Sequence, residues 1–196
     1  GDVLILYGDV PFVPTATMQA MIDRLGAADA PAVVVLAFEP ADPLQYGRVI
    51  TAKDSEGDDR VVKMVEHKDA TDAERAVRLC NSGLMAAKAR DLFALLARVT
   101  DDNAAKEFYL VDIVNIANAD GRHCAVVRTD PADVAGINSR AELAAAEAQW
   151  QAFKRAEAMA GGASLKAPET VWFSWDTEIG RDVTIEPNVF FGPGVT

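Results

Sequence analysis

The chain has 196 residues, of which 50% are apolar and 25% charged, and its formal net charge is −11 at pH 7. This composition is that of a folded chain long enough for one domain and part of another. The acidic excess argues against a nucleic-acid surface, because phosphate backbones are bound by Lys and Arg. We expect no membrane span and no signal peptide. The two cysteines, Cys80 and Cys124, form no CxxC motif, which favours reduced thiols in a cytoplasmic protein.

The first stretch, Val3 to Pro11, is an apolar run that stops at Gly8, Asp9 and Pro11. Such a run predicts a central strand buried on both faces, as in a parallel sheet. Asp9 would then lie just past the carboxyl end of the strand, where open α/β sheets bind ligands. A carboxylate at that edge suits Mg²⁺ beside a phosphate. An aspartate before Val-Pro is also ordinary turn chemistry, and these residues alone favour the turn.

The next residues predict a βαβ unit followed by a hairpin. A helix opens at Pro14–Thr15 and ends at Gly26, and a second buried strand occupies 32–38. The hairpin turns at 55–59 between two short apolar strands. Strand, helix and strand in this order predict an α/β fold.

A later strand, 79–86, is broken by the polar pair Asn81–Ser82. Polar side chains inside an apolar strand need partners, so this pair indicates either a ligand site or an internal hydrogen bond. The other elements expected before residue 130 are a short helix after a capping box at Thr71, helices at 87–99 and 107–117, and a strand at 123–127.

The longest predicted element is a helix from Arg140 to about Ala160, capped by Ser139 and ended by Gly161–Gly162. Its thin apolar stripe is typical of a connector. Beyond it, two residue sets recur every six positions, which is the hexapeptide period of a parallel β-helix. The first set is Phe173, Ile179, Ile185 and Phe191, and the second is Thr177, Val183, Val189 and Val195.

Six short motifs occur in one order ahead of this tail. They are Leu6–Pro11, Gly47–Arg48, Val65–Ala70, Asn81–Gly83, Glu107–Tyr109 and Gly136–Arg140. Together they resemble the bacterial bifunctional enzymes that acetylate glucosamine-1-phosphate and then couple the product to UTP. Each motif alone is weak, but their combination with the hexapeptide tail is specific, and it covers nearly the whole chain.

The resemblance implies an α/β fold in three parts. Residues 1–138 would be the C-terminal part of a Rossmann-like nucleotidyltransferase domain, 139–162 a linker helix, and 163–196 the first coil of a left-handed parallel β-helix. Because the chain starts directly in a strand and stops inside a repeat, we expect an internal fragment. The loop that grips the triphosphate and the acetyl-transfer site would then lie outside it, so we expect the fragment alone to be inactive.

The implied reaction is Mg²⁺-dependent uridylyl transfer from UTP to N-acetylglucosamine-1-phosphate, which gives UDP-N-acetylglucosamine for cell-wall and lipopolysaccharide precursors. Asp9 and Asn138 are the implied catalytic residues and metal ligands. The implied substrate-binding residues are Tyr7, Gly8, Asp9, Gly47, Glu66, Asn81 and Asn138. The whole protein would use acetyl-CoA in its second domain, form a homotrimer, and engage neither nucleic acid nor membrane.

Two positions depart from the family pattern, because Val111 replaces the usual threonine and Lys106 the usual glycine. Val111 removes a hydroxyl that a sugar or phosphate could use. Two other interpretations stay open. One is a different sugar-1-phosphate nucleotidyltransferase, against which the stretch Glu66–Asp69 weighs. The other is a non-catalytic scaffold that trimerises through its β-helix, which would need no pair like Asp9 and Asn138.

Overall fold

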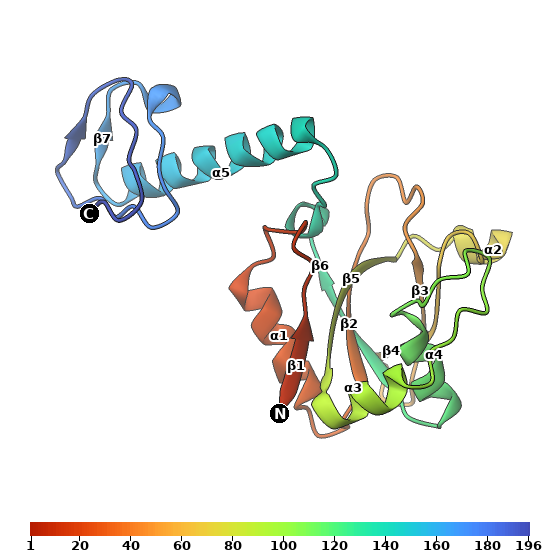
Figure 1. Cartoon of the computed structure of the whole chain (residues 1–196). Coiled ribbons are helices and arrows are strands. Elements are labelled where there is room, and N and C mark those ends of the chain that lie inside the picture. Colours follow the sequence, from red (N-terminus) through yellow and green to blue (C-terminus); the bar gives the residue numbers. More distant parts are fainter. The chain divides into compact units, whose positions relative to one another are not determined.

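The structure is a computed structural model that describes residues 1–196 and separates them into two units, residues 1–136 and residues 137–196 (Figure 1). The long helix that the sequence suggests as a separate linker groups with the tail in the second unit. None of the helices combines the length and apolar composition that a membrane span requires.

A six-stranded mixed sheet in the order β1-β5-β2-β6-β4-β3 forms the centre of the first unit. β2 pairs in parallel with β6 and antiparallel with β5. β5 also meets β3 at Cys80 and Arg48, so the first residues of these two strands lie side by side. The strands are β1 (Asp2–Ile5), β2 (Val33–Phe38), β3 (Arg48–Lys53), β4 (Asp59–Val65), β5 (Cys80–Lys88) and β6 (Cys124–Thr129).

Helices cover both faces of this sheet (Figure 1). Every residue of β2 is buried, and successive side chains point to opposite faces. Val34 and Leu36 pack in one core with α1, whereas Val33 and Val35 pack in the other with α3 and α4. The helices of this unit are α1 (Thr15–Leu25), α2 (Asp72–Arg75), α3 (Ala89–Leu96) and α4 (Asp112–Ala119), with a 3-10 turn, η1 (Pro131–Val134).

The first strand corrects the sequence prediction of a buried central strand. β1 lies at the end of the sheet, pairs only with β5 in antiparallel fashion, and stops at Ile5. Its apolar side chains are half-buried. A continuous apolar run indicates a strand but not its neighbours, and β5 inserts between β1 and β2 from a distant part of the sequence.

Most other elements follow the sequence, with one late start. α1 begins after Pro14 and ends at Gly26, as predicted. The helix expected from residue 107 begins instead at Asp112. The Asn103 side chain explains the delay, because its Oδ1 accepts the backbone N–H of Glu107 at 3.2 Å and holds the preceding residues as a loop. Such side-chain bonds compete with helix formation.

α4 also fixes the end of β4. The Asn115 side chain accepts the N–H of Met64 at 3.0 Å and donates to the Met64 carbonyl at 2.9 Å, as a neighbouring strand would. Asn118 donates to the carbonyl of Val61 at 2.9 Å. The Asn115 amide thus satisfies backbone groups of Met64 that β6 does not reach, because β6 pairs with β4 only at Arg60 and Val61.

The second unit joins α5 (Arg140–Ala160) to an extended coil. Ser139 caps the helix by accepting the N–H of Glu142 at 3.1 Å. The Glu142 carboxylate in turn accepts the N–H of Asn138 at 2.6 Å, one residue before the N–H that a capping box would use. The helix bounds agree with the sequence prediction.

In the coil, the chain returns to lie parallel to itself. β7 (Ser164–Leu165) pairs in parallel with β8 (Thr184–Ile185), and after the 3-10 turn η2 (Pro168–Thr170), Trp172 forms a parallel bridge with Phe190. The rings of Phe173 and Phe191 stack at 5.3 Å. The residues of the first six-residue set, Phe173, Ile179, Ile185 and Phe191, share one small core, so the period marks the inward positions.

Gln151 joins α5 to this coil. It is 2% exposed, and its amide donates to the Phe173 carbonyl at 2.8 Å and accepts the Phe173 N–H at 2.9 Å. Arg155, one helical turn later, donates to the carbonyl of Val171 at 2.8 Å. Gln151 thus bonds to both backbone groups of Phe173, as a neighbouring strand would.

Candidate functional site

The turn after β1 presents the first predicted site residues. The Val10 N–H donates to the Tyr7 carbonyl at 3.2 Å, so Gly8 and Asp9 occupy the corners of a turn. Asp9 is exposed. A Cβ built on Gly8 would meet no atom within 4 Å, so the protein itself imposes no steric need for glycine there. Asp9 is therefore a turn residue, and its exposed carboxylate is also available to a ligand.

Tyr7 folds back onto the start of β5. A Cβ built on Gly83 would lie 2.2 Å from Cε2 of the Tyr7 ring, and Gly83 has a φ of +87°. Burial raises the pKa of the Tyr7 hydroxyl, and the charges of Glu66 and then Asp9 raise it further. Tyr7 thus lies within electrostatic range of both carboxylates.

Asn81 and Gly47 meet where β3 and β5 begin. The Asn81 N–H donates to the Gly47 carbonyl at 2.9 Å, and the Asn81 side-chain oxygen accepts the Gly83 N–H at 2.9 Å. Ser82 donates to the Leu36 carbonyl at 2.7 Å. The polar break in the predicted strand therefore has internal hydrogen bonds, and it also places Asn81 among the other predicted binding residues.

Glu66, which directly follows β4, lies against Gly47. A Cβ built on Gly47 would lie 3.1 Å from each carboxylate oxygen of Glu66, so a side chain at position 47 would have to displace this carboxylate. Burial raises the pKa of Glu66, and the charges of Asp69 and Asp112 raise it further. Burial likewise raises the pKa of Asp112, with Asp69 contributing. Glu66 is thus a partly desolvated carboxylate in acidic surroundings.

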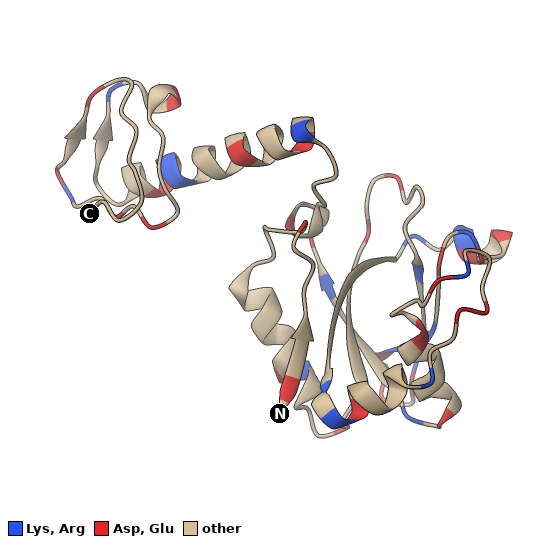
Figure 2. Cartoon of the chain, viewed as in Figure 1, with Lys and Arg blue, Asp and Glu red and all other residues tan.

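A pocket of about 190 Å³ opens beside Glu66. One wall comes from the loop before β3, and another from the residues after β4. Figure 2 shows charged residues of both signs on α2 and the loops beside it. The lining residues are Gln45, Glu66, His67, Lys68, Glu107 and Tyr109. A carboxylate, an ammonium group and a phenol around one cavity suit a polar, hydroxyl-bearing ligand.

Asn138 belongs to the second unit, where it is exposed just before the cap of α5. Its backbone N–H is held by Glu142. The structure therefore gathers Tyr7, Gly47, Glu66 and Asn81 in the first unit, with Asp9 within electrostatic range of Tyr7.

Sequence reasoning missed the roles of Gly83 and Arg48, although both lie inside the quoted motifs. The positive φ of Gly83 depends on its contact with Tyr7, which is distant in sequence. Arg48 is buried at the head of β3. An arginine at the start of an apolar strand is a signal of a buried hydrogen-bonding role, because a charged side chain is rarely buried without partners.

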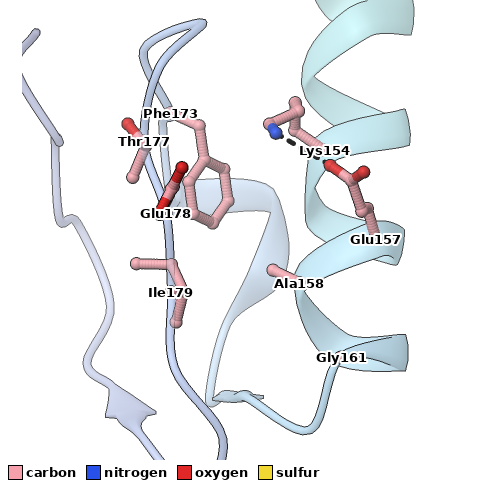
Figure 3. Close-up of a pocket in the computed structure, with 8 residues that line it drawn as sticks. All are labelled: Lys154, Glu157, Ala158, Gly161, Phe173, Thr177, Glu178 and Ile179. Atoms are coloured by element: carbon pink, nitrogen blue, oxygen red, sulfur yellow. Dashed lines mark hydrogen bonds and ion pairs between the residues drawn. The ribbon is translucent and has the colours of Figure 1, made fainter. Parts of the chain in front are cut away.

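A separate cavity of about 290 Å³ lies between α5 and the coil in the second unit (Figure 3). Its walls are mixed: Phe173 and Ile179 face it from the coil, while Lys154 and Glu157 form an ion pair on the helix side at 2.7 Å. None of the predicted site residues lines this cavity.

Comparison with solved structures defines the class of fold. The structure of CMP:2-keto-3-deoxy-manno-octonic acid synthetase complexed with CTP matches with a TM-score of 0.54 and 16% identity, over 78% of this chain and 62% of the other. A putative glucose-1-phosphate thymidylyltransferase from Bacillus anthracis matches with a TM-score of 0.52 and 14% identity, over 76% and 54%. The fold is the Rossmann-like α/β fold of nucleotidyltransferases.

Sequence comparison identifies the nearer relatives. A bifunctional protein GlmU of Sphingopyxis alaskensis is 89% identical over 195 residues, which are 100% of this chain and 42% of the relative. The bifunctional protein GlmU of Novosphingobium aromaticivorans is 72% identical over 193 residues, 98% of this chain and 42% of the relative. No family model matches. The chain thus spans less than half the length of these relatives, and the resemblance that its motifs indicate is confirmed.

Proposed function

We propose that the first unit is part of a uridylyltransferase that joins UTP to N-acetylglucosamine-1-phosphate and releases pyrophosphate. The observation that carries the proposal is the meeting of Gly47, Glu66 and Asn81 beside a polar pocket. The similarity to bifunctional GlmU proteins, one of them 89% identical, supports this reaction for the group of residues.

In this proposal each residue has a physical task. The Glu66 carboxylate accepts hydrogen bonds from sugar hydroxyls, and its partial burial makes each such bond stronger than it would be in water. Asn81 has its side-chain oxygen held by the Gly83 N–H, which leaves its amide N–H groups for the ligand. Gly47 keeps the backbone open where Glu66 approaches. Tyr7 and Gly8 contact the sugar nucleotide from the turn after β1.

We propose Asp9 and Asn138 as the residues that would hold Mg²⁺. Both side chains are exposed and carry the hard oxygen atoms that Mg²⁺ prefers. The structure contains no group of three or more His, Cys, Asp or Glu side chains arranged to bind a metal. One carboxylate and one amide nevertheless fit this ion, because Mg²⁺ keeps several waters and shares its remaining sites with substrate phosphates. When bound, it would neutralise charge on the phosphates during transfer.

For the second unit, we propose a linker helix and the first coil of a left-handed parallel β-helix. The parallel pairing of β7 with β8 and of Trp172 with Phe190, together with hydrogen bonds between residues 17 to 20 positions apart, supports a turn of three hexapeptides. In the whole protein such a β-helix would carry an acetyltransferase that uses acetyl-CoA and would assemble as a homotrimer. The name "bifunctional" of the relatives supports this extension.

The competing proposal is another sugar-1-phosphate nucleotidyltransferase, since a thymidylyltransferase shares the fold. A pyrophosphate-release assay separates the two. It should be run on a protein of the relatives' full length that carries this chain, with UTP or dTTP and with N-acetylglucosamine-1-phosphate or glucose-1-phosphate. We expect turnover with UTP and the acetylated amino sugar, at least tenfold above the other pairs (about 1.4 kcal/mol). Preference for glucose-1-phosphate or dTTP would refute the proposal.

The metal ligands are tested by sugar-nucleotide binding with and without Mg²⁺. We expect Asp9→Ala and Asn138→Ala each to abolish the Mg²⁺-dependent part of the affinity. Asp2→Ala is the matched control, because Asp2 is a carboxylate at the start of β1, the strand that leads into the turn with Asp9, but it pairs with Lys88 at 2.7 Å. Retained Mg²⁺ dependence in Asp9→Ala, or absence of any such dependence before substitution, would rule out this metal assignment.

A further inference from the structure

Arg48 is a buried cation without an acidic partner. The residue is 3% exposed, and its guanidinium donates only to backbone carbonyls. Nη2 lies 3.3 Å from the Leu44 carbonyl and Nε lies 3.3 Å from the Arg75 carbonyl, and Nη1 donates to the carbonyls of Pro43 and Tyr46. Burying a charge is costly unless polar groups satisfy it. This side chain therefore belongs to the construction of the loop at 43–46.

That loop needs such support. Leu44 has a φ of +40°, in the left-handed region where a residue other than glycine is strained. The Leu44 N–H is held by Asp42 at 3.0 Å, and the Tyr46 ring packs edge-on against Phe38 at 5.0 Å. Strained loops persist where several contacts determine them together. The buried Arg48 side chain supplies several of these contacts, because it donates to three carbonyls of the loop.

A second arginine, Arg75, links Arg48 to another wall of the pocket, the residues after β4. Arg75 offers its carbonyl to Arg48, and its own Nε donates to the His67 carbonyl at 3.3 Å. Arg48 thus ties the wall that contains Gln45 to α2, and Arg75 ties α2 to the wall at 66–68. Residues of both walls line the pocket.

We propose that Arg48, together with Arg75, is a positioning residue that sets the spacing of the two pocket walls and thereby the affinity for the sugar phosphate. This inference rests on the proposed function for the identity of the ligand. Neither guanidinium lines the pocket. Lysine cannot replace Arg48, because a single ammonium group does not reproduce the planar fork that reaches several carbonyls.

The kinetic test compares Arg48→Lys and Arg75→Gln with a matched control in a protein of the relatives' full length that carries this chain. We expect Arg48→Lys to raise KM for N-acetylglucosamine-1-phosphate about tenfold, with kcat and the KM for UTP within about twofold. Arg75→Gln should raise the same KM about threefold, because only one of the two interactions that it removes, the bond to the His67 carbonyl, reaches a pocket wall; the other is the exposed ion pair with Asp72. Arg155→Lys also removes a bond to a backbone carbonyl, but in the second unit, and should change neither KM.

Hydrogen exchange without ligand tests the positioning role even if the substrate is not N-acetylglucosamine-1-phosphate. We expect faster amide hydrogen exchange at 44–47 in Arg48→Lys and at 66–68 in Arg75→Gln, with β2 unchanged. Exchange that rises across the whole sheet, or in neither wall, would overturn the positioning role, as would equal changes in both KM values. If Arg48→Lys does not fold, Arg75→Gln decides alone. Lack of uridylyl transfer in the unsubstituted protein would defeat the proposed function while leaving the exchange result decisive.

Discussion

The ring of Tyr7 lies against the α-carbon of Gly83, so closely that a Cβ there would be 2.2 Å from the ring. This contact joins the turn after β1 to the start of β5. It also leaves the Tyr7 hydroxyl within the electrostatic range of Glu66 and Asp9. A glycine in β5 therefore determines where the first site residue lies.

Replacing Gly83 with alanine should displace Tyr7 and weaken sugar-nucleotide binding. Backbone strain at φ +87° should also cost about 1–2 kcal/mol of unfolding free energy. Gly57→Ala is the matched control, since Gly57 has a φ of +90° and open space around its α-carbon. Urea unfolding followed by tyrosine absorbance measures the strain, and ligand titration measures the contact. Equal loss of affinity in the two variants would show that strain alone is responsible.

Glu66→Gln should stabilise the protein at neutral pH while weakening sugar binding. Burial raises the folded-state pKa of Glu66 above its usual 4.5. Ionisation therefore destabilises the folded state at any pH above the raised value, and this penalty disappears below 4.5, where the carboxyl is protonated in both states. The gain from glutamine should shrink as the pH falls toward that value.

The control for the pH dependence of Glu66→Gln is Glu107→Gln, which alters an exposed carboxylate of the same pocket. Unfolding free energies of both variants should be measured between neutral and acidic pH. We expect the pH-dependent gain only for Glu66→Gln. A gain that is constant with pH, or the same in both variants, would contradict the assigned burial effect.

Gln151→Ala should destabilise the second unit selectively. The substitution leaves the buried N–H and carbonyl of Phe173 without partners, at a cost of about 1–3 kcal/mol for each group. All three tryptophans, Trp150, Trp172 and Trp175, lie in this unit, so tryptophan fluorescence follows its unfolding. The exposed neighbour Gln149→Ala is the control. A similar small effect of both substitutions would mean that the Gln151 bonds contribute little.

Lys106→Gly should stabilise the first unit. Lys106 has a φ of +56°, and glycine removes the left-handed penalty of about 1–2 kcal/mol while adding about 0.4–1 kcal/mol of unfolded-chain entropy. A net gain of roughly 0.5–1 kcal/mol is therefore expected. Lys106→Ala discards the same charge but keeps the strain, so it should give no gain in urea unfolding. If Lys106→Ala stabilises the protein as much as Lys106→Gly does, the gain comes from removing the charge and not from relieving the backbone strain.

Most residues of the candidate site could be predicted from the sequence, but not the contacts that hold them together. Gly47, Glu66 and Asn81 stand at strand ends, and local pattern places such residues at a sheet edge. The contact of Asn81 with Gly47, and the bond from Arg48 to the Arg75 carbonyl, join parts of the chain that are distant in sequence. A residue that donates to backbone carbonyls leaves no periodic signal.

What the sequence determined by itself was local: the ends of α1 and α5 at Gly26 and Ser139, the hairpin of β3 and β4, and the six-residue period of the coil. Caps, turns and side-chain periods act over a few residues, so they can be read in order. Only the tertiary structure decided that β1 takes an antiparallel partner at the end of the sheet and that Gln151 is buried. Both outcomes depend on which distant backbone groups remain to be paired, because every buried N–H and carbonyl needs a partner.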